Sequence, residues 1–400
     1  MPKNTCEEVS LKGSYALVVA GVLLGSYAKG GALYWCLVMM VALAAAAVSV
    51  YKALVEANAQ AFFEKRDQDA PLVRTLVNAL QGGPDESRRE AARDLAMKAA
   101  GSAYDRDLIA SQGACGPLVQ LCRNGGSDET RSVAAAALGN LAANALLRKR
   151  TLPASGAVEA LLALARSPHD AGDGCRSACT ALRNMAFDNE TKALIADNGG
   201  VEVACALLRR GATTTKSGPY AMAGAALLGT LCWGSASSKK QAVAGHAVEP
   251  LTRLCACFAS DEASATCGAF ALRHMAADGD TRGAVGKTET ITILARCARS
   301  DGSAGAEARK ALRELAADES ALVAMGRHGA FHACASVLER DGCADCAAVL
   351  WAGSAKKASL VDVGRALDVR TTKGPVRGHD VDLVIRALLK RHRGVNKKTQ

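Results

Sequence analysis

One short pattern of small and large apolar residues recurs along most of the chain. Each copy but the first opens on a small residue, continues with apolar residues three and four positions later, and closes on a large one seven positions later, as in Ala134, Ala137, Leu138 and Leu141. The first copy, which closes at Leu95, opens on Arg88 instead. This spacing predicts an amphipathic helix whose small end can approach a neighbouring helix closely. The closing residues lie 46, 44, 46, 44, 40 and 35 residues apart and are Leu95, Leu141, Met185, Leu231, Met275, Leu315 and Leu350.

A second phrase, a glycine followed by a longer apolar run, keeps the same phase. Its glycines are spaced by 43, 43, 46, 41 and 43 residues and are Gly113, Gly156, Gly199, Gly245, Gly286 and Gly329. We expect each glycine to adopt the left-handed backbone that ends one helix before the next begins. A unit of this kind cannot bury its apolar face alone, whereas stacked units can. The sequence therefore predicts an all-α fold, a right-handed α-solenoid of about six to seven helical repeats.

Two uncharged apolar stretches precede the repeats. Residues 13–28 and 30–51 contain no charged side chain and are separated by Lys29. As helices they would extend roughly 24 Å and 33 Å, compared with ~30 Å for the hydrocarbon core of a membrane. Aromatic residues, Trp35 among them, bracket both stretches, as is typical of membrane interfaces. We therefore expect one or two transmembrane helices within residues 13–51.

Three interpretations of these stretches remain open: a single span at residues 31–51, a helical hairpin that turns at residues 26–31, or a targeting segment cleaved after Ala28. For a membrane anchor, the basic residues that follow favour a cytoplasmic location of the repeats. The expected organisation is a tail at 1–12, the membrane segment at 13–51, a juxtamembrane helix at 52–70, the repeats at 71–372, and a capping helix with a basic tail at 373–400.

Composition supports this fold class. Half of the residues are hydrophobic and only 4% are aromatic, which argues against a disordered chain and against a β-rich fold. The net charge is +10, but ten basic and three acidic residues lie from Arg365 onward, so most of the charge belongs to the tail. This distribution does not predict a nucleic-acid-binding surface.

Candidate chemistry is sparse. Most of the fifteen cysteines fall at positions expected to be buried, so we interpret them as reduced core thiols. The Cys343-x-x-Cys346 pair is the one candidate redox motif, although both residues fall on the buried register of a repeat helix. The histidines lack the spacing of metal ligands, and no catalytic constellation emerges. We therefore expect neither an enzyme nor a cofactor, and no small-molecule substrate.

The two repeated phrases resemble those of the armadillo family. The resemblance rests on an A-x-x-A-L-x-N-L helix, an x-x-G-A-V-x-x-L-L-x-L-x-x-S helix and a period of roughly 42 residues, and it covers residues 71–369. It implies that the last helix of each repeat lines a concave groove, where an asparagine pairs with the backbone of an extended peptide. The matching positions here are Asn140, Asn184, Thr230, His274 and Glu314. The resemblance implies protein binding at Asn140 and Asn184, with His274 at the same phase.

The preceding position holds Arg183, Arg273 and Arg313, which would form a stripe that favours an acidic partner. The tryptophan array of importin-type grooves has no counterpart at the matching positions, which argues against a nuclear-import receptor. The sequence as a whole thus predicts a membrane-anchored scaffold that binds other proteins along its concave face. Two alternatives are a thiol-dependent redox protein using Cys343 and Cys346, and a soluble trafficking adaptor with a cleaved N-terminal segment.

Overall fold

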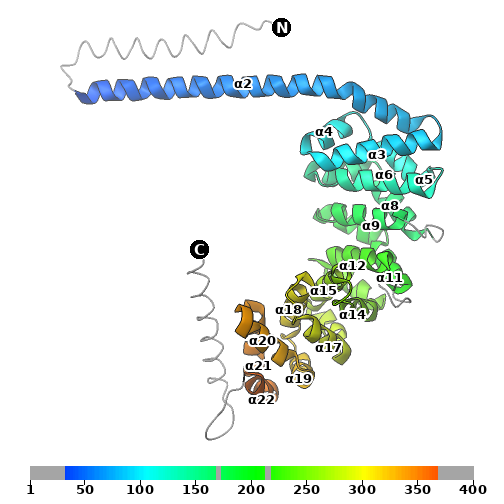
Figure 1. Ribbon diagram of the computed structural model, residues 1–400, viewed down its shortest axis with the longest axis vertical. Coiled ribbons are helices and arrows are strands. Elements are labelled where there is room, and N and C mark those ends of the chain that lie inside the picture. The colour runs from blue at the N-terminus through cyan, green and yellow to red at the C-terminus, as the bar shows by residue number, and fades with distance from the viewer. Residues whose placement is uncertain (1–31, 168–172, 212–217, 368–400) are drawn as a thin grey trace. The chain divides into compact units, whose positions relative to one another are not determined.

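The computed structural model describes residues 32–167, 173–211 and 218–367, and within these ranges the regular structure is entirely helical (Figure 1). The chain divides into two compact units between Leu72 and Val73. The predicted tail at 1–12, the first apolar stretch at 13–28 and the segment at 373–400 lie outside the described residues. The all-α prediction is confirmed for the part of the chain that the structure covers.

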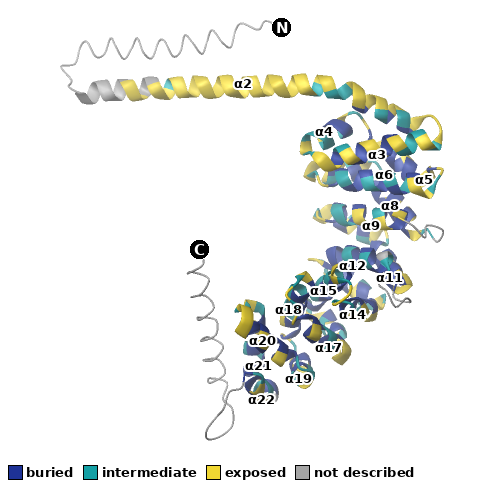
Figure 2. Ribbon diagram, viewed as in Figure 1, coloured by how far each residue is buried: buried dark blue, intermediate teal, exposed yellow. Residues whose placement is uncertain are grey.

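The described part of the first unit belongs to a single long helix, α2 (Ala32–Gln81), which contains Pro71. The predicted juxtamembrane helix at 52–70 is therefore part of a continuous helix. Much of this helix is exposed to solvent (Figure 2). Among its apolar side chains, Leu43, Val48, Tyr51 and Phe63 are all more than half exposed. Among the described residues, no helix is long and apolar enough to cross a membrane. The predicted transmembrane segment is therefore unsupported.

The second unit is a stack of three-helix repeats. The first helices are α4 (Ala103–Ser111), η1 (Leu147–Thr151) with α7 (Leu152–Ala154), α10 (Asn189–Asp197), α13 (Ala236–Ala244), α16 (Gly279–Val285), α19 (Glu319–Arg327) and α22 (Lys357–Ala366). The second helices are α5 (Cys115–Asn124), α8 (Ala157–Arg166), α11 (Gly200–Gly211), α14 (Val248–Ala256), α17 (Thr288–Cys297) and α20 (Ala330–Asp341). The third helices are α3 (Asp85–Gly101), α6 (Asp128–Leu141), α9 (Asp173–Met185), α12 (Pro219–Cys232), α15 (Glu262–Ala276), α18 (Ser303–Leu315) and α21 (Ala344–Ser354).

The core runs along the stack, between the helices of successive repeats. The anchor residues that close the repeated pattern are buried, including Leu141, Met185, Leu231 and Met275. Close approach of third helices requires small residues: a Cβ on Gly139 would lie 3.2 Å from the Cα of Ala181 in the next repeat. The small residue that opens the pattern also packs closely: a Cβ on Gly224 would lie 2.8 Å from the carbonyl oxygen of Ala204, in the second helix of the same repeat. The predicted small-to-large order of the pattern thus matches how the helices pack.

Helix corners follow the glycine prediction at four of the six positions. Gly113, Gly156, Gly199 and Gly329 have φ of +80°, +77°, +83° and +74°. The prediction is wrong at the other two, because Gly245 has φ −75° and Gly286 has φ −70°. Beside Gly245 the left-handed residue is instead His246, with φ +57°.

Candidate functional site

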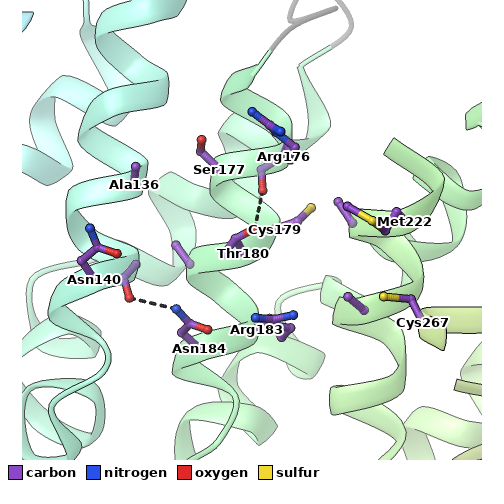
Figure 3. A pocket seen from close by; sticks show the side chains of 14 residues that line it. Ala136, Asn140, Arg176, Ser177, Cys179, Thr180, Arg183, Asn184, Met222 and Cys267 are labelled. Atoms are coloured by element: carbon purple, nitrogen blue, oxygen red, sulfur yellow. Dashed lines mark hydrogen bonds between the residues drawn. The ribbon is translucent and has the colours of Figure 1, made fainter. Parts of the chain in front are cut away.

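A pocket of about 400 Å³ opens on the face formed by the third helices α6, α9, α12 and α15 (Figure 3). It is centred on α9, which contributes Arg176, Thr180, Arg183 and Asn184. The lining residues from the other three helices include Ala136, Asn140, Met222, Ala223, Ala226 and Cys267. The pocket therefore brings together three of the six residues predicted to bind protein, namely Asn140, Arg183 and Asn184.

The two asparagines make equivalent contacts between repeats. The Nδ2 of Asn140 donates to the carbonyl oxygen of Ala96 at 2.8 Å, and the Nδ2 of Asn184 donates to that of Gly139 at 3.0 Å. Each acceptor lies in the third helix of the preceding repeat. In the described chain, the Oδ1 atom and the second N–H of each amide have no protein partner. Each amide thus joins two repeats and still offers one donor and one acceptor.

The residues equivalent to these asparagines in the later repeats make different contacts. The hydroxyl of Thr230 donates to Ala226 O of its own helix at 3.0 Å, so it forms no bridge between repeats. Glu314 accepts a contact of 3.0 Å from its neighbour Arg313. His274 is only 9% exposed. The repeated amide bridge therefore ends at α9, because α12 carries a short hydroxyl side chain in its place.

The three predicted arginines do not form a stripe of free charges. Arg273 pairs with Glu307 at 3.1 Å, and Arg313 pairs with Asp345 at 2.5 Å, in each case on the third helix of the next repeat. Arg183 makes no ion pair within the described ranges, and its Nε is buried without an acceptor. Whether any of the three binds a partner stays a prediction, but only Arg183 has a guanidinium that the solenoid leaves unneutralised.

An aromatic cluster beside these positions was missed by sequence reasoning. Trp233, half exposed at the end of α12, stacks on His274 with ring centroids 6.0 Å apart. Phe270 contacts His274 edge-on, with ring centroids 4.5 Å apart. Lys192 lies over the Trp233 ring at 5.2 Å and donates to Trp233 O at 2.9 Å. Burial, aided by the charge of Arg273, lowers the pKa of His274 to about 4, so its ring is neutral near pH 7.

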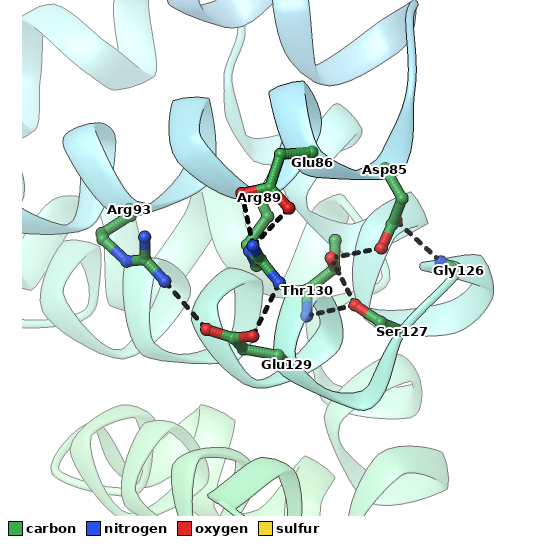
Figure 4. Close-up of polar contacts among 8 residues, drawn as sticks. All are labelled: Asp85, Glu86, Arg89, Arg93, Gly126, Ser127, Glu129 and Thr130. Carbon is green, nitrogen blue, oxygen red and sulfur yellow. Dashed lines mark hydrogen bonds and ion pairs between the residues drawn. The ribbon is translucent and has the colours of Figure 1, made fainter.

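Polar contacts between α3 and α6 hold the N-terminal side of the site (Figure 4). Glu129 on α6 pairs with Arg89 at 2.7 Å and with Arg93 at 2.9 Å. Asp85 at the start of α3 accepts from the Thr130 hydroxyl at 2.9 Å and from the Gly126 amide at 3.1 Å. These bonds, together with the Asn140 amide, fix α6 against α3 at both ends.

The thiols lack the chemistry that a redox function requires. Cys346 is fully buried; a hydrogen bond with Cys334 and burial raise its pKa. A hydrogen bond with Cys346 and then burial raise the pKa of Cys343. A redox-active pair needs a thiolate of low pKa, so the redox alternative gains no support. In the described chain no group of three or more histidine, cysteine or carboxylate side chains is arranged to hold a metal ion.

Comparison with known proteins supports the repeat assignment. Residues 102–143, which contain α4, α5 and α6, match the armadillo/β-catenin-like repeat family. No curated protein matches the sequence. Among solved structures, an engineered protein is similar at 27% identity with a TM-score of 0.56, covering 62% of this chain and 99% of its own.

Two designed armadillo repeat proteins are similar in fold. One has 21% identity and a TM-score of 0.54, covering 61% of this chain and 99% of its own. The other, in complex with the peptide (KR)4, has 19% identity and a TM-score of 0.53, with the same two coverages. The second unit of this chain thus has the fold of an armadillo solenoid, and residues 102–143 match the armadillo repeat itself.

Proposed function

We propose that this protein is a scaffold, and not an enzyme, that binds an extended segment of a partner protein across α6, α9 and α12. The observation that carries the proposal is the pair of amides from Asn140 and Asn184 at one pocket, each with a donor and an acceptor unused by the solenoid. An amide side chain with this pattern matches one peptide unit of an extended backbone. The two amides would fix the path of the segment without reading its sequence.

The similar structures support this proposal at the level of the fold. One of the designed armadillo proteins was solved with a bound peptide, and another design is described as intended for modular peptide recognition. The same arrangement of third helices is present here, and the pocket lies on it.

The experiment is an array of immobilised ten-residue peptides of varied sequence, probed with the full chain. We expect Asn140→Ala/Asn184→Ala to weaken the enriched peptides about tenfold, because two backbone hydrogen bonds of roughly 0.5–1.5 kcal/mol each are lost. Both substitutions also remove bonds between repeats, so the control must do the same elsewhere. Thr252→Val breaks a buried bond to Thr290 of the next repeat (3.0 Å) without touching the pocket. Equal binding by the double variant and the wild type would contradict the proposal.

We also propose that the segment at residues 13–51 anchors the protein in a membrane, with the repeats in the cytoplasm. The uncharged run at residues 30–51 and the exposure of Leu43 and Val48 support this proposal. Leu43→Lys/Val48→Lys should release the protein, because a lysine at the centre of a span costs about 3 kcal/mol. Alkaline extraction of membranes measures the release, and protease protection measures sidedness. Release of the unaltered protein by alkali would rule out an integral anchor.

A further inference from the structure

Arginines recur at one position of the third helices, two residues before the anchor. They are Arg93, Arg183, Arg273 and Arg313. Three of the four pair with a carboxylate of the following third helix: Arg93 with Glu129, Arg273 with Glu307, and Arg313 with Asp345. Arg183 is the exception within the described residues, and its Nε is buried without an acceptor.

The reason for the exception lies on α12. Glu307 stands eight residues before its anchor Leu315, and Asp345 stands five residues before its anchor Leu350. The same two positions on α12, counted from Leu231, are Ala223 and Ala226. Both alanines line the pocket that contains Arg183. The solenoid therefore has a cavity and an unpaired guanidinium at the place where the other repeats supply a carboxylate.

The charges of the residues that line the pocket also indicate a site for an acidic group. Its lining includes two arginines and no acidic side chain. Arg176 is balanced by Asp173 at 2.6 Å, which leaves Arg183 as the uncompensated charge of the lining. Figure 3 shows the Arg183 guanidinium directed across the pocket toward α15 and Cys267. Burying part of a cation without an acceptor is costly, and a carboxylate placed there would recover that cost.

We propose that Arg183, Ala223 and Ala226 form a subsite for a glutamate side chain of the bound segment. This inference rests on the proposed function and adds a sequence preference to it. The ligand supplies to Arg183, from another chain, the carboxylate that the solenoid itself supplies to Arg273 and Arg313. The alanines and Met222 accommodate the methylene groups of the glutamate, and the guanidinium binds its carboxylate. A lysine at this position of the ligand is repelled by Arg183.

The peptide array described above tests the subsite when glutamate, glutamine and lysine are exchanged at each position of the enriched peptides. The wild type should prefer glutamate over glutamine at one position by about tenfold, the usual contribution of a hydrogen bond to a charged group. Arg183→Gln should abolish that preference, and Arg183→Glu should replace it with lysine at the same position. Arg273→Gln is the matched control, since it removes an arginine of the same phase that already has a partner.

A second variant tests whether the carboxylate that α12 lacks explains the preference. Ala223→Glu places on α12 the carboxylate that α18 carries at Glu307, so it should form an ion pair with Arg183. The variant should lose the glutamate preference, and it should stay folded with an unchanged or higher melting temperature. A glutamate preference that survives in Arg183→Gln, or that is absent from the wild type, overturns the subsite. If binding still depends on Asn140 and Asn184 in that case, the proposed function stands alone. A preference for a free C-terminal carboxylate over internal glutamate would also overturn it.

Discussion

The side chains of Asn140 and Asn184 each perform two tasks with one amide. One N–H ties a third helix to the helix before it, at 2.8 Å and 3.0 Å, and the rest of the amide faces the pocket. Fixing the amide in this way reduces the side-chain entropy that a ligand would otherwise have to overcome. The same contact explains why an asparagine is favoured here over threonine, which in α12 bonds its own helix.

Acid should destabilise the repeats through His274. The residue is 9% exposed, and burial lowers its pKa from about 6.5 to about 4. Between these values the unfolded chain binds more protons than the folded one, so stability is fully present above pH 6.5 and falls as the pH falls toward 4. The loss attributable to His274 is on the order of 2–3 kcal/mol at pH 4.

Urea unfolding at pH 7, 5.5 and 4.5 measures this effect in the wild type and in His274→Asn. The variant should be less stable at pH 7 because it loses the stacking on Trp233 and Phe270. Its stability should nevertheless change less with pH. Parallel pH profiles for the two proteins would show that His274 does not titrate in this window.

Cys267 offers a direct report of ligand binding. It lines the pocket and is partly exposed, and burial raises its pKa, so alkylation should be followed at about pH 9. An enriched peptide at saturating concentration should slow alkylation of Cys267, read residue by residue by mass spectrometry. Cys257 is the internal control, because it is also partly exposed but ends α14, outside the pocket. Equal protection of both thiols would place the peptide elsewhere.

The pocket residues were only in part predictable from the sequence. Asn140 and Asn184 could be found because they recur at one phase of a repeat. The pairing of Arg273 and Arg313 could not, because their partners Glu307 and Asp345 occupy two different positions in their helices. Trp233 was missed for a similar reason: no other repeat has a tryptophan at its position, so no periodic signal marks it.

At the scale of the helices, spacing within the stack depends on a few small residues and on bonds at the helix ends. Arg123, Arg166 and Arg209 close the second helices α5, α8 and α11, and each donates to a backbone carbonyl of the next repeat. The acceptors are Gly156, Asn198 and Gly245, at the corners between first and second helices. These arginines lie 43 residues apart. Their hydrogen bonds therefore form a second periodic set of contacts between repeats, in addition to the asparagine bonds and away from the third-helix pocket.

Gly139→Leu should loosen the contact between α6 and α9. Even a Cβ at this position lies 3.2 Å from both the Cα and the Cβ of Ala181, so a leucine must push the helices apart, at a cost of about 1–3 kcal/mol. The same shift would strain the bond from Asn184 to Gly139 O. Chemical denaturation measures the cost.

Ala136→Leu is the matched control for this prediction. Ala136 lies one helical turn before Asn140 and faces the pocket instead of the neighbouring helix. A leucine there should leave stability nearly unchanged and weaken peptide binding by filling the site. A large loss of stability in Ala136→Leu with none in Gly139→Leu would contradict the packing described for these helices.

For the whole molecule, the boundary between the two units predicts independent stability of the repeats. The part of α2 that follows the boundary belongs to the same unit as the repeats, and its residues Val73, Val77 and Leu80 are buried. In contrast, the apolar side chains of residues 43–63 are largely exposed. A chain that begins at Lys52 should therefore keep the melting temperature of the full chain to within a few degrees, since a change of 1 kcal/mol moves a large domain by only about 2–4 °C. Calorimetry of both chains measures this. A large drop would show that the N-terminal residues contribute to the solenoid.

The fold was predictable because the sequence contains two separate periodic signals: the spacing of apolar residues within each helix, and the spacing of the anchor residues from one repeat to the next. The anchors from Leu141 to Leu315 recur every 40–46 residues, and they are buried between the helices of the stack. The helix corners were less predictable, since the conformation that Gly113 and Gly156 adopt is taken by His246 at one corner. A local backbone conformation can move by one residue without changing the phase of the helices on either side, so the pattern of apolar positions does not record it.

The preference for an acidic ligand could be moved along the solenoid by two substitutions. Ala223→Glu on α12 together with Glu307→Ala on α18 would neutralise Arg183 and leave Arg273 unpaired, while the composition and net charge of the chain stay the same. The acidic preference should then move two repeats along the array, and a bound segment would be read in a new register. Ligand specificity in this solenoid is thus encoded by which repeat omits its own carboxylate.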